Sequence, residues 1–169
     1  YLKEPEFHVL HNLYIQRDDR SSQIDHLVIA SNGIWVIESK YRTGKIIVDH
    51  ARWLVVTDSG RRILMVSPVA QNYRHIMDVK EFLRIHIGDQ VDEIPFHNVV
   101  CLADGVELKL EDCTEGNHIL TPDELLHLIC ETRSPVPLDP DFCAQLIAHL
   151  RPTAASLRTA AGTQGDTPA

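Results

Sequence analysis

Two carboxylates and a lysine, Asp25, Glu38 and Lys40, lie within one apolar stretch of the sequence. Carboxylate oxygens are the ligands that Mg²⁺ prefers, and a lysine beside them can orient a water molecule or neutralise the charge that develops on phosphorus during hydrolysis. A charge on a mostly buried surface needs a partner or a metal, because it loses its hydration. The spacing therefore fits a metal-and-water site, and it fits equally a structural ion pair between Asp25 and Lys40 with Glu38 at the rim.

A β-hairpin would position these three residues. Residues 23–40 contain two runs rich in Val and Ile, joined by Asn32-Gly33, a dipeptide typical of a tight type I′ turn. With these two residues as the loop, Asp25 lies opposite Lys40. Residues that are directly opposed, or two apart along a strand, share a face of the sheet, so the pattern predicts that all three charged side chains point the same way.

The motifs of this hairpin resemble the NERD (nuclease-related) domain, a branch of the PD-(D/E)xK nuclease superfamily. The most specific matches are Gln-Ile-Asp-His at 23–26 and Ile-Glu-Ser-Lys at 37–40. Further matches lie at 67–72, 96–102 and 120–126, so the resemblance covers roughly residues 1–130. It implies an α/β fold of the restriction-endonuclease-like type, in which a mixed sheet is flanked by helices.

The resemblance also implies a metal-dependent phosphodiesterase site. Carried over by position, Asp25 and Glu38 bind Mg²⁺ or Mn²⁺, and Lys40 acts on the attacking water. Gln71 braces the site from the start of a helix, with a plain surface amide as the alternative role for this residue.

A long helix is predicted over residues 69–87, opened by Pro68 and closed by Gly88. Its apolar stripe consists of Ile76, Val79, Leu83 and Ile87. Gln71 lies in its first turn, where free N–H groups and the positive end of the helix dipole favour a phosphate or a metal-bound water. His75 follows one turn later on the same face and is the one histidine that we expect near the site.

The remaining elements surround this hairpin and helix. The sequence predicts strands at 7–15, 45–48, 53–57, 61–66 and 99–102, and helices at 122–130 and 141–150. The acidic segment 108–116 is expected to be a loop with a short edge strand. We expect a nuclease-like domain at 1–133, a linker and C-terminal helix at 134–150 and a flexible tail at 151–169. Trp35 and Trp53 are expected in the core. His26 faces away from its neighbour Asp25 by strand alternation and is expected to be structural.

The distribution of charge is compatible with a nucleic-acid partner, although the formal net charge is −8. Residues 1–88 hold 12 Lys and Arg against 10 Asp and Glu, a net +2, whereas residues 89–169 hold 4 against 14, a net −10. The acidic half therefore lies away from the proposed site, and phosphate backbones attract basic surfaces. The residues expected to contact DNA are Arg42, Lys45 and Arg74, with scattered solvated charge as the alternative for each.

Composition and length bound the class of protein. A chain of 169 residues, 44% hydrophobic and 24% charged, suits one globular domain with a sizeable core. No apolar run reaches membrane-spanning length and no signal-peptide pattern stands at the start, so we expect a cytoplasmic protein without a membrane partner. The four cysteines are widely spaced and are expected to be free reduced thiols.

Together, the residues and the resemblance predict a Mg²⁺- or Mn²⁺-dependent deoxyribonuclease, with RNA as a further candidate substrate. A homo-oligomer or a fusion to a larger nucleic-acid-processing protein is compatible with this prediction. The competing hypothesis is a nucleic-acid-binding or assembly module that keeps the fold without cleavage. It rests on the family's further glutamate, on a helix before the first strand, to which neither Glu4 nor Glu6 is matched. Either this sequence begins after that helix, or the site has one acidic group fewer. Retention of Asp25, Glu38 and Lys40 together favours activity, because a structural role needs only a pair.

Overall fold

The computed structural model of the protein describes residues 7–17, 20–41, 44–49, 52–103, 106–110 and 117–161. The larger of the two sheets in these residues has five strands, in the order β1 (Phe7–Arg17), β2 (Arg20–Ala30), β3 (Gly33–Lys40), β7 (Phe96–Leu102) and β9 (Asn117–Leu120). Neighbouring strands are antiparallel from β1 to β3 and parallel from β3 to β9. The sheet is therefore mixed, as predicted.

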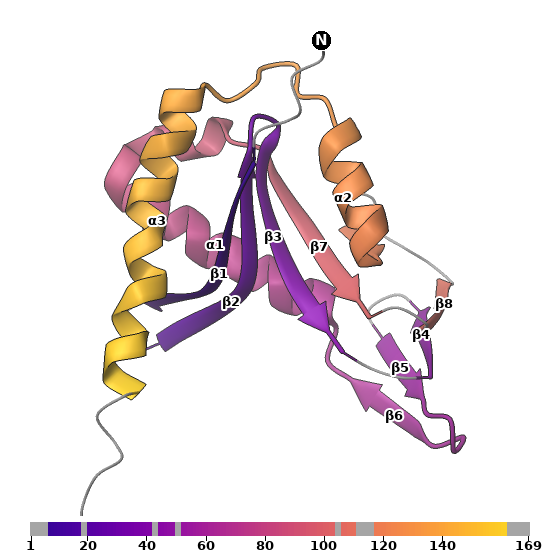
Figure 1. Ribbon diagram of the computed structural model, residues 1–169. Helices are drawn as coiled ribbons and strands as arrows, with labels where there is room; N and C mark the ends of the chain where they lie inside the picture. The colour runs from indigo at the N-terminus through magenta and orange to yellow at the C-terminus, as the bar shows by residue number, and fades with distance from the viewer. Residues whose placement is uncertain are drawn as a thin grey trace, which may run out of the picture.

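Helices cover both faces of this sheet. α1 (Pro68–Ile87) and α3 (Pro140–Ala161) lie on one face, and α2 (Pro122–Glu131) lies on the other (Figure 1). Successive side chains of β3 point to opposite faces of the sheet, so each face is covered by its own helices. Ile34 packs with residues of α1 and α3, whereas its neighbour Trp35 packs with residues of α2. This is the restriction-endonuclease-like α/β architecture that the sequence predicts. No helix in the described part of the chain is long and apolar enough to span a membrane.

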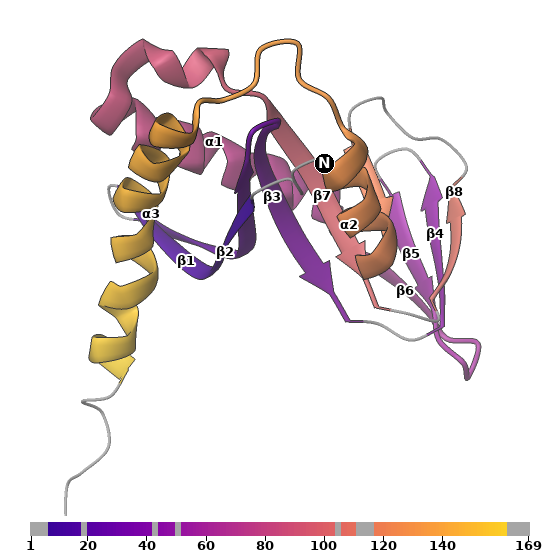
Figure 2. The ribbon, with the colours of Figure 1, turned by 45° about the horizontal axis from the view of Figure 1, so that its top comes forward.

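A second, smaller sheet lies beside the ends of β3 and β7 (Figure 2). Its strands follow the order β6 (Arg62–Met65), β5 (Arg52–Val56), β4 (Lys45–Asp49) and β8 (Glu107–Leu110). Its inner face packs Trp53 against Val100 of β7. Trp53 and Trp35 are only 1% and 0% exposed, respectively, which confirms that both tryptophans belong to the core.

The register of the β2–β3 hairpin differs from the predicted one. Ser31 and Asn32 form the loop, and Ala30 pairs with Gly33. Continuing this pairing brings Asp25 level with Glu38, so the prediction that Asp25 lies opposite Lys40 is wrong. The shift moves the pairing by two residues, which is one full period of the strand and leaves the faces unchanged.

The side chain of Asn32 explains this register. Its amide nitrogen donates hydrogen bonds to the carbonyl oxygens of Ile129 (2.8 Å) and Thr132 (3.0 Å), at the end of α2. Its amide oxygen accepts one from the Trp35 indole at 2.9 Å. Gly33, with φ of 133°, approaches the Pro95 carbonyl so closely that an added Cβ would lie 2.4 Å from that oxygen. Tertiary contacts, and not turn preference alone, therefore fix the loop.

Several predicted elements match the structure within one residue, namely α1, β4, β5, β6 and α2. The Ser67 hydroxyl caps α1 by accepting from the Ala70 N–H, and Gly88 closes the helix with a positive φ of 62°. Two short elements escaped prediction, β9 and the 3₁₀ helix Gly88–Glu93.

The prediction for the C-terminal segment is wrong in part. α3 continues to Ala161, so residues 151–161 are helical and do not belong to a flexible tail. The interior Pro152 lacks an N–H for helical bonding. The hydroxyl of the following residue, Thr153, donates a hydrogen bond to the Leu150 carbonyl oxygen at 2.6 Å. The rest of the predicted tail, residues 162–169, lies outside the described residues.

Candidate active site

Glu38 and Lys40 form the centre of the site, at the carboxyl end of β3. Lys40 Nζ lies 2.5 Å from Glu38 Oε1, and the side chains of Lys40 and Glu38 are 22% and 5% exposed. Both residues continue the face that Ile34 presents to α1, because alternate residues of a strand share a face. The buried carboxylate thus has the cationic partner that burial requires. In the structure Lys40 pairs with Glu38, and not with Asp25 as the structural alternative expected.

The first two turns of α1 supply the next layer of the site. Gln71 Oε1 lies 3.4 Å from Lys40 Nζ, and His75 Nε2 lies 3.6 Å from Glu38 Oε2. Gln71 and His75 are four residues apart, which places them on one helical face. The structure therefore brings Gln71 to the predicted site, and it places His75 there as expected.

Asn72 fixes this part of α1 against the sheet and was not singled out from the sequence. Its side chain is 0% exposed, and its amide nitrogen donates to the carbonyl oxygens of Val36 (2.7 Å) and Val99 (3.1 Å) and to Asn98 Oδ1 (2.8 Å). The Asn98 amide in turn donates to the carbonyl of Val69 at 3.1 Å. These bonds hold the start of α1 over β3 and β7, which sets the position of the neighbouring Gln71.

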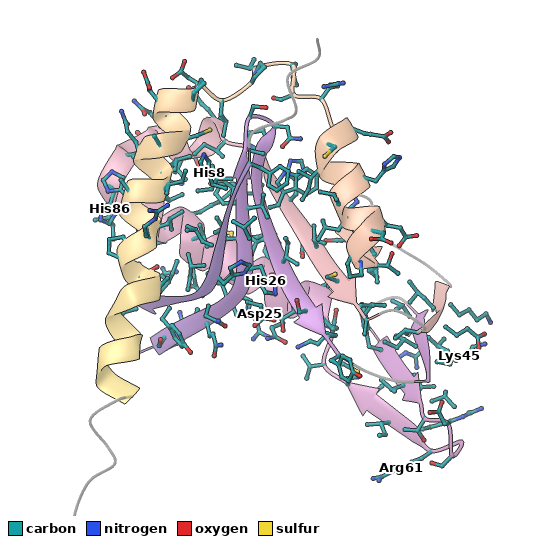
Figure 3. The ribbon with its side chains drawn as sticks, viewed as in Figure 1. His8, Asp25, His26, Lys45, Arg61 and His86 are labelled. Carbon is teal, nitrogen blue, oxygen red and sulfur yellow. The ribbon has the colours of Figure 1, made fainter. Side chains whose placement is uncertain are left out.

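Asp25 joins the site from β2. Its Oδ2 accepts a hydrogen bond from the backbone N–H of Ser39, the residue between Glu38 and Lys40, at 2.9 Å. Figure 3 shows Asp25 on β2 near the arrowhead of β3. Asn12 of β1 lies level with Asp25 in the pairing of β1 with β2. It is the one non-glycine residue of the described chain with a positive φ, 51°. Such local backbone distortion is often found at functional sites.

The immediate neighbour His26 takes no part in this group. His26 Nδ1 lies 2.7 Å from Nδ1 of His11 on β1, and the two rings meet edge to face. Burial lowers the pKa of His26, and the nearby His11 lowers it further, against a smaller raising effect of Asp25. His26 is therefore a hydrogen-bonded structural histidine, as predicted.

The site contains buried polar atoms that lack a hydrogen-bond partner among the described residues. Neither ring nitrogen of His75 has a hydrogen-bond partner among the described residues, although both atoms are buried. Buried polar groups in native proteins normally have a partner, which is frequently water or an ion. The described residues contain no cluster of three or more His, Cys, Asp or Glu side chains that could hold a metal ion. A cation here would rely on Asp25 and Glu38, with water and substrate completing its shell.

The predicted DNA-binding residues have different locations. Arg42 lies outside the described residues. Lys45 lies on β4 of the small sheet, where it pairs with Glu107, and Figure 3 shows it well away from Asp25. Arg74 lies on the exposed side of α1 and lines a cavity of about 680 Å³ that also borders Gln71 and His75. Of the two predicted contacts that the structure describes, Arg74 is therefore the one placed beside the site.

Comparison with known proteins agrees with this geometry. The profile of the nuclease-related domain (NERD) matches residues 1–103, which include β1 to β3, α1 and β7. A relative from Bacillus anthracis, described as an uncharacterized protein, is 35% identical over 83 residues, which are 47% of this chain and 38% of the relative. No solved structure was found to match the chain. The chain therefore belongs to the nuclease-related domain family, a branch of the PD-(D/E)xK nucleases.

Proposed function

We propose that this domain is a nuclease that hydrolyses phosphodiester bonds in DNA, with Mg²⁺ or Mn²⁺ as its cofactor. The main support is the buried Glu38–Lys40 pair at the end of β3, in contact with Gln71 and His75 of α1. Burying two charges is expensive, and apolar residues would meet a purely structural need at lower cost. Membership of the nuclease-related family supports the same conclusion.

In this proposal, Asp25 and Glu38 hold the cation from the neighbouring strands β2 and β3. Mg²⁺ is commonly held by one or two carboxylates and keeps several waters, so two protein ligands are compatible with binding. When bound, the cation would lower the pKa of a water molecule and neutralise negative charge on the phosphate.

Lys40 and Gln71 would orient the reacting groups. Lys40 Nζ, at the carboxyl end of β3 beside Glu38, would meet the attacking water or the negative charge that develops on phosphorus. Gln71 Oε1, 3.4 Å from Lys40 Nζ, limits where the ammonium can move. The free N–H groups at the start of α1 also favour a phosphate near Gln71.

A second candidate function is a nucleic-acid-binding or assembly module without cleavage. The observation that favours it is the absence of a three-residue metal cluster from the described part of the chain. The segment that matches spans 38% of the length of its relative.

A cleavage time course separates the two candidates. Linear DNA, supercoiled DNA and RNA are incubated with Mg²⁺ or Mn²⁺, and Glu38→Gln serves as the blank. Cleavage of DNA above the blank supports the nuclease. A protein that shifts DNA in a gel but cleaves no substrate above the blank would instead be a binding module. Cleavage of RNA alone would overturn the choice of substrate.

A further inference from the structure

A cavity of about 680 Å³ lies between α1 and the ends of β1 and β2, next to the active site. Arg17 and Arg20 line it from the two strands, and Arg74 lines it from α1. Gln71 and His75, which contact Lys40 and Glu38, line it as well. The cavity and the active site therefore share one wall.

The charge of this wall contrasts with that of the whole chain. The protein has 16 Lys and Arg against 24 Asp and Glu, yet among the residues that the structure describes three arginines and a single carboxylate, that of Asp78, line the cavity. Arg17 Nη1 lies 3.6 Å from Asp78 Oδ1, so this arginine is partly neutralised. Arg20 and Arg74 have no ion-pair partner among the described residues. The two remaining guanidinium groups favour an anion, and their planar shape suits phosphate oxygens.

The cavity is built by interactions between the hairpin and the helix. Asp78 accepts a hydrogen bond from the Ser22 hydroxyl and contacts Arg17, which ties the ends of β1 and β2 to α1. Gln71, Arg74 and Asp78 follow each other at intervals of three and four residues, which places them on one face of the helix. The ends of β1 and β2, which carry Arg17 and Arg20, are therefore held against α1, which carries Arg74, before any ligand binds.

The cavity is wide and partly open to solvent. Its volume of about 680 Å³ has room for a sugar and its phosphates from one strand, since sites of about 300–1,000 Å³ are typical of small ligands. We propose that this cavity binds the backbone of one DNA strand beside the bond that is cleaved. This inference deepens the proposed nuclease function and depends on it for the position of the scissile bond.

Fluorescence anisotropy of a labelled single-stranded oligonucleotide in EDTA tests the binding without cleavage. Arg20→Gln and Arg74→Gln should each weaken binding by about tenfold, because each removes charge-assisted hydrogen bonds to phosphate. Each should also reduce the salt slope of log K by about 0.7, as expected for one fewer phosphate contact on a single strand. Arg61→Gln is the matched control, because Arg61 is an exposed arginine next to β6 of the small sheet (Figure 3).

A substitution that is expected to strengthen DNA binding provides a second test. Asp78→Asn removes the carboxylate of Asp78, the one acid among the described lining residues, and keeps an oxygen that can accept from the Ser22 hydroxyl. It should tighten DNA binding severalfold, because Arg17 loses the charge that neutralises it. Unchanged or weaker binding by a folded Asp78→Asn protein would count against the cavity. Thermal unfolding of each variant establishes that it is folded.

The outcomes separate this inference from the proposed function. If Arg20→Gln and Arg74→Gln bind DNA as Arg61→Gln does, the cavity is not the strand site, whatever the wild type cleaves. If they lose affinity while the wild type cleaves nothing, the binding site stands and the nuclease proposal fails. Competition with dAMP provides a further check. A cavity made for a free nucleotide would bind dAMP more tightly than the oligonucleotide, which would overturn the proposal.

Discussion

Glu38 Oε2 lies 3.6 Å from His75 Nε2, while Oε1 of the same carboxylate contacts Lys40 Nζ at 2.5 Å. One buried carboxylate therefore lies between an ammonium on its own strand and an imidazole on α1. A change at Glu38 affects both neighbours, and each neighbour can be changed alone. Variants of Glu38, Lys40 and His75 can therefore separate metal binding, cleavage and folding.

Glu38→Gln should abolish Mn²⁺ binding and leave the protein folded. The amide keeps the size of the carboxylate but loses the charge that attracts a hard cation. Isothermal titration with Mn²⁺ measures the difference. Glu107→Gln is the matched control, because Glu107 also pairs with a lysine, Lys45, but lies on the small sheet. Equal Mn²⁺ binding by wild type and Glu38→Gln would remove Glu38 from the metal site.

Lys40→Met should retain DNA affinity but lower the cleavage rate by about 10²–10³-fold, the usual cost of removing one group that stabilises transition-state charge. Methionine keeps much of the apolar stem of lysine without its ammonium. DNA affinity is measured in EDTA, and single-turnover cleavage is measured with Mg²⁺. A variant that cleaves at the wild-type rate would assign the role of Lys40 to another residue.

His75→Phe should reduce cleavage by about tenfold while leaving the free energy of unfolding unchanged or raised. Neither ring nitrogen has a hydrogen-bond partner among the described residues, so phenylalanine removes two buried polar atoms without breaking a hydrogen bond to any of those residues. Urea denaturation and single-turnover cleavage are measured on the same preparation. A loss of stability above about 1 kcal/mol would show that an imidazole nitrogen has a structural partner.

The strands and helix that carry the site could be predicted because local signals and packing agree. The Val and Ile runs give β2 and β3, and the signals at Pro68 and Gly88 bound α1. Side chains alternate between the two faces of β3, and residues four apart share one face of α1. These two patterns place Glu38 and Gln71 in the same layer.

The remaining features depend on contacts between residues far apart in the sequence. The hairpin register follows from Asn32, whose side chain binds carbonyl groups of Ile129 and Thr132. The Arg17 and Arg20 side chains flank a polar turn in the sequence, and only their packing against α1 makes them part of a cavity. The four residues of β9 are all half-buried, so they show no alternation for a sequence pattern to reveal.

The pH dependence of stability should report the buried histidines. Burial lowers the pKa of His97 below its ordinary value of 6.5, so the unfolded chain binds protons more readily than the folded one. The stabilisation is complete above pH 6.5 and is lost as the pH falls toward the lowered pKa. The free energy of unfolding should therefore be lower at pH 5.5 than at pH 7.5. The carboxyls with lowered pKa, Asp92 and Glu124, titrate below this range.

His97→Phe tests this assignment. The His97 ring stacks on Trp35 with centroids 3.8 Å apart and an interplanar angle of 14°, a contact that phenylalanine can keep. The variant should lose less stability than wild type between pH 7.5 and pH 5.5, as measured by urea denaturation at both values. It should keep some dependence, because burial also lowers the pKa of His26 and His118. Identical pH dependence in both proteins would contradict the role of His97.

Gly33→Ala should destabilise the protein more than Gly60→Ala, although both glycines have a positive φ, 133° and 78°. Backbone strain alone costs about 1–3 kcal/mol at either position. A Cβ at Gly60 meets nothing within 4 Å, whereas one at Gly33 would lie 2.4 Å from the Pro95 carbonyl oxygen. The clash would push β3 away from Pro95. It would thereby disrupt the hydrogen bond, 2.9 Å long, that the Ile34 N–H donates to the same carbonyl oxygen.

This contact sets the register between β3 and β7, which pairs Ile34 with Phe96 and continues to Glu38 beside Val100. Urea denaturation should therefore show a lower midpoint for Gly33→Ala with an unchanged slope, since the same surface is exposed on unfolding. Because the displaced strand carries Glu38, the folded Gly33→Ala protein should also bind Mn²⁺ more weakly than the folded Gly60→Ala protein. Equal midpoints for the two variants would show that β3 and β7 can separate at Pro95 without cost, and the hairpin loop would then not be fixed by this approach.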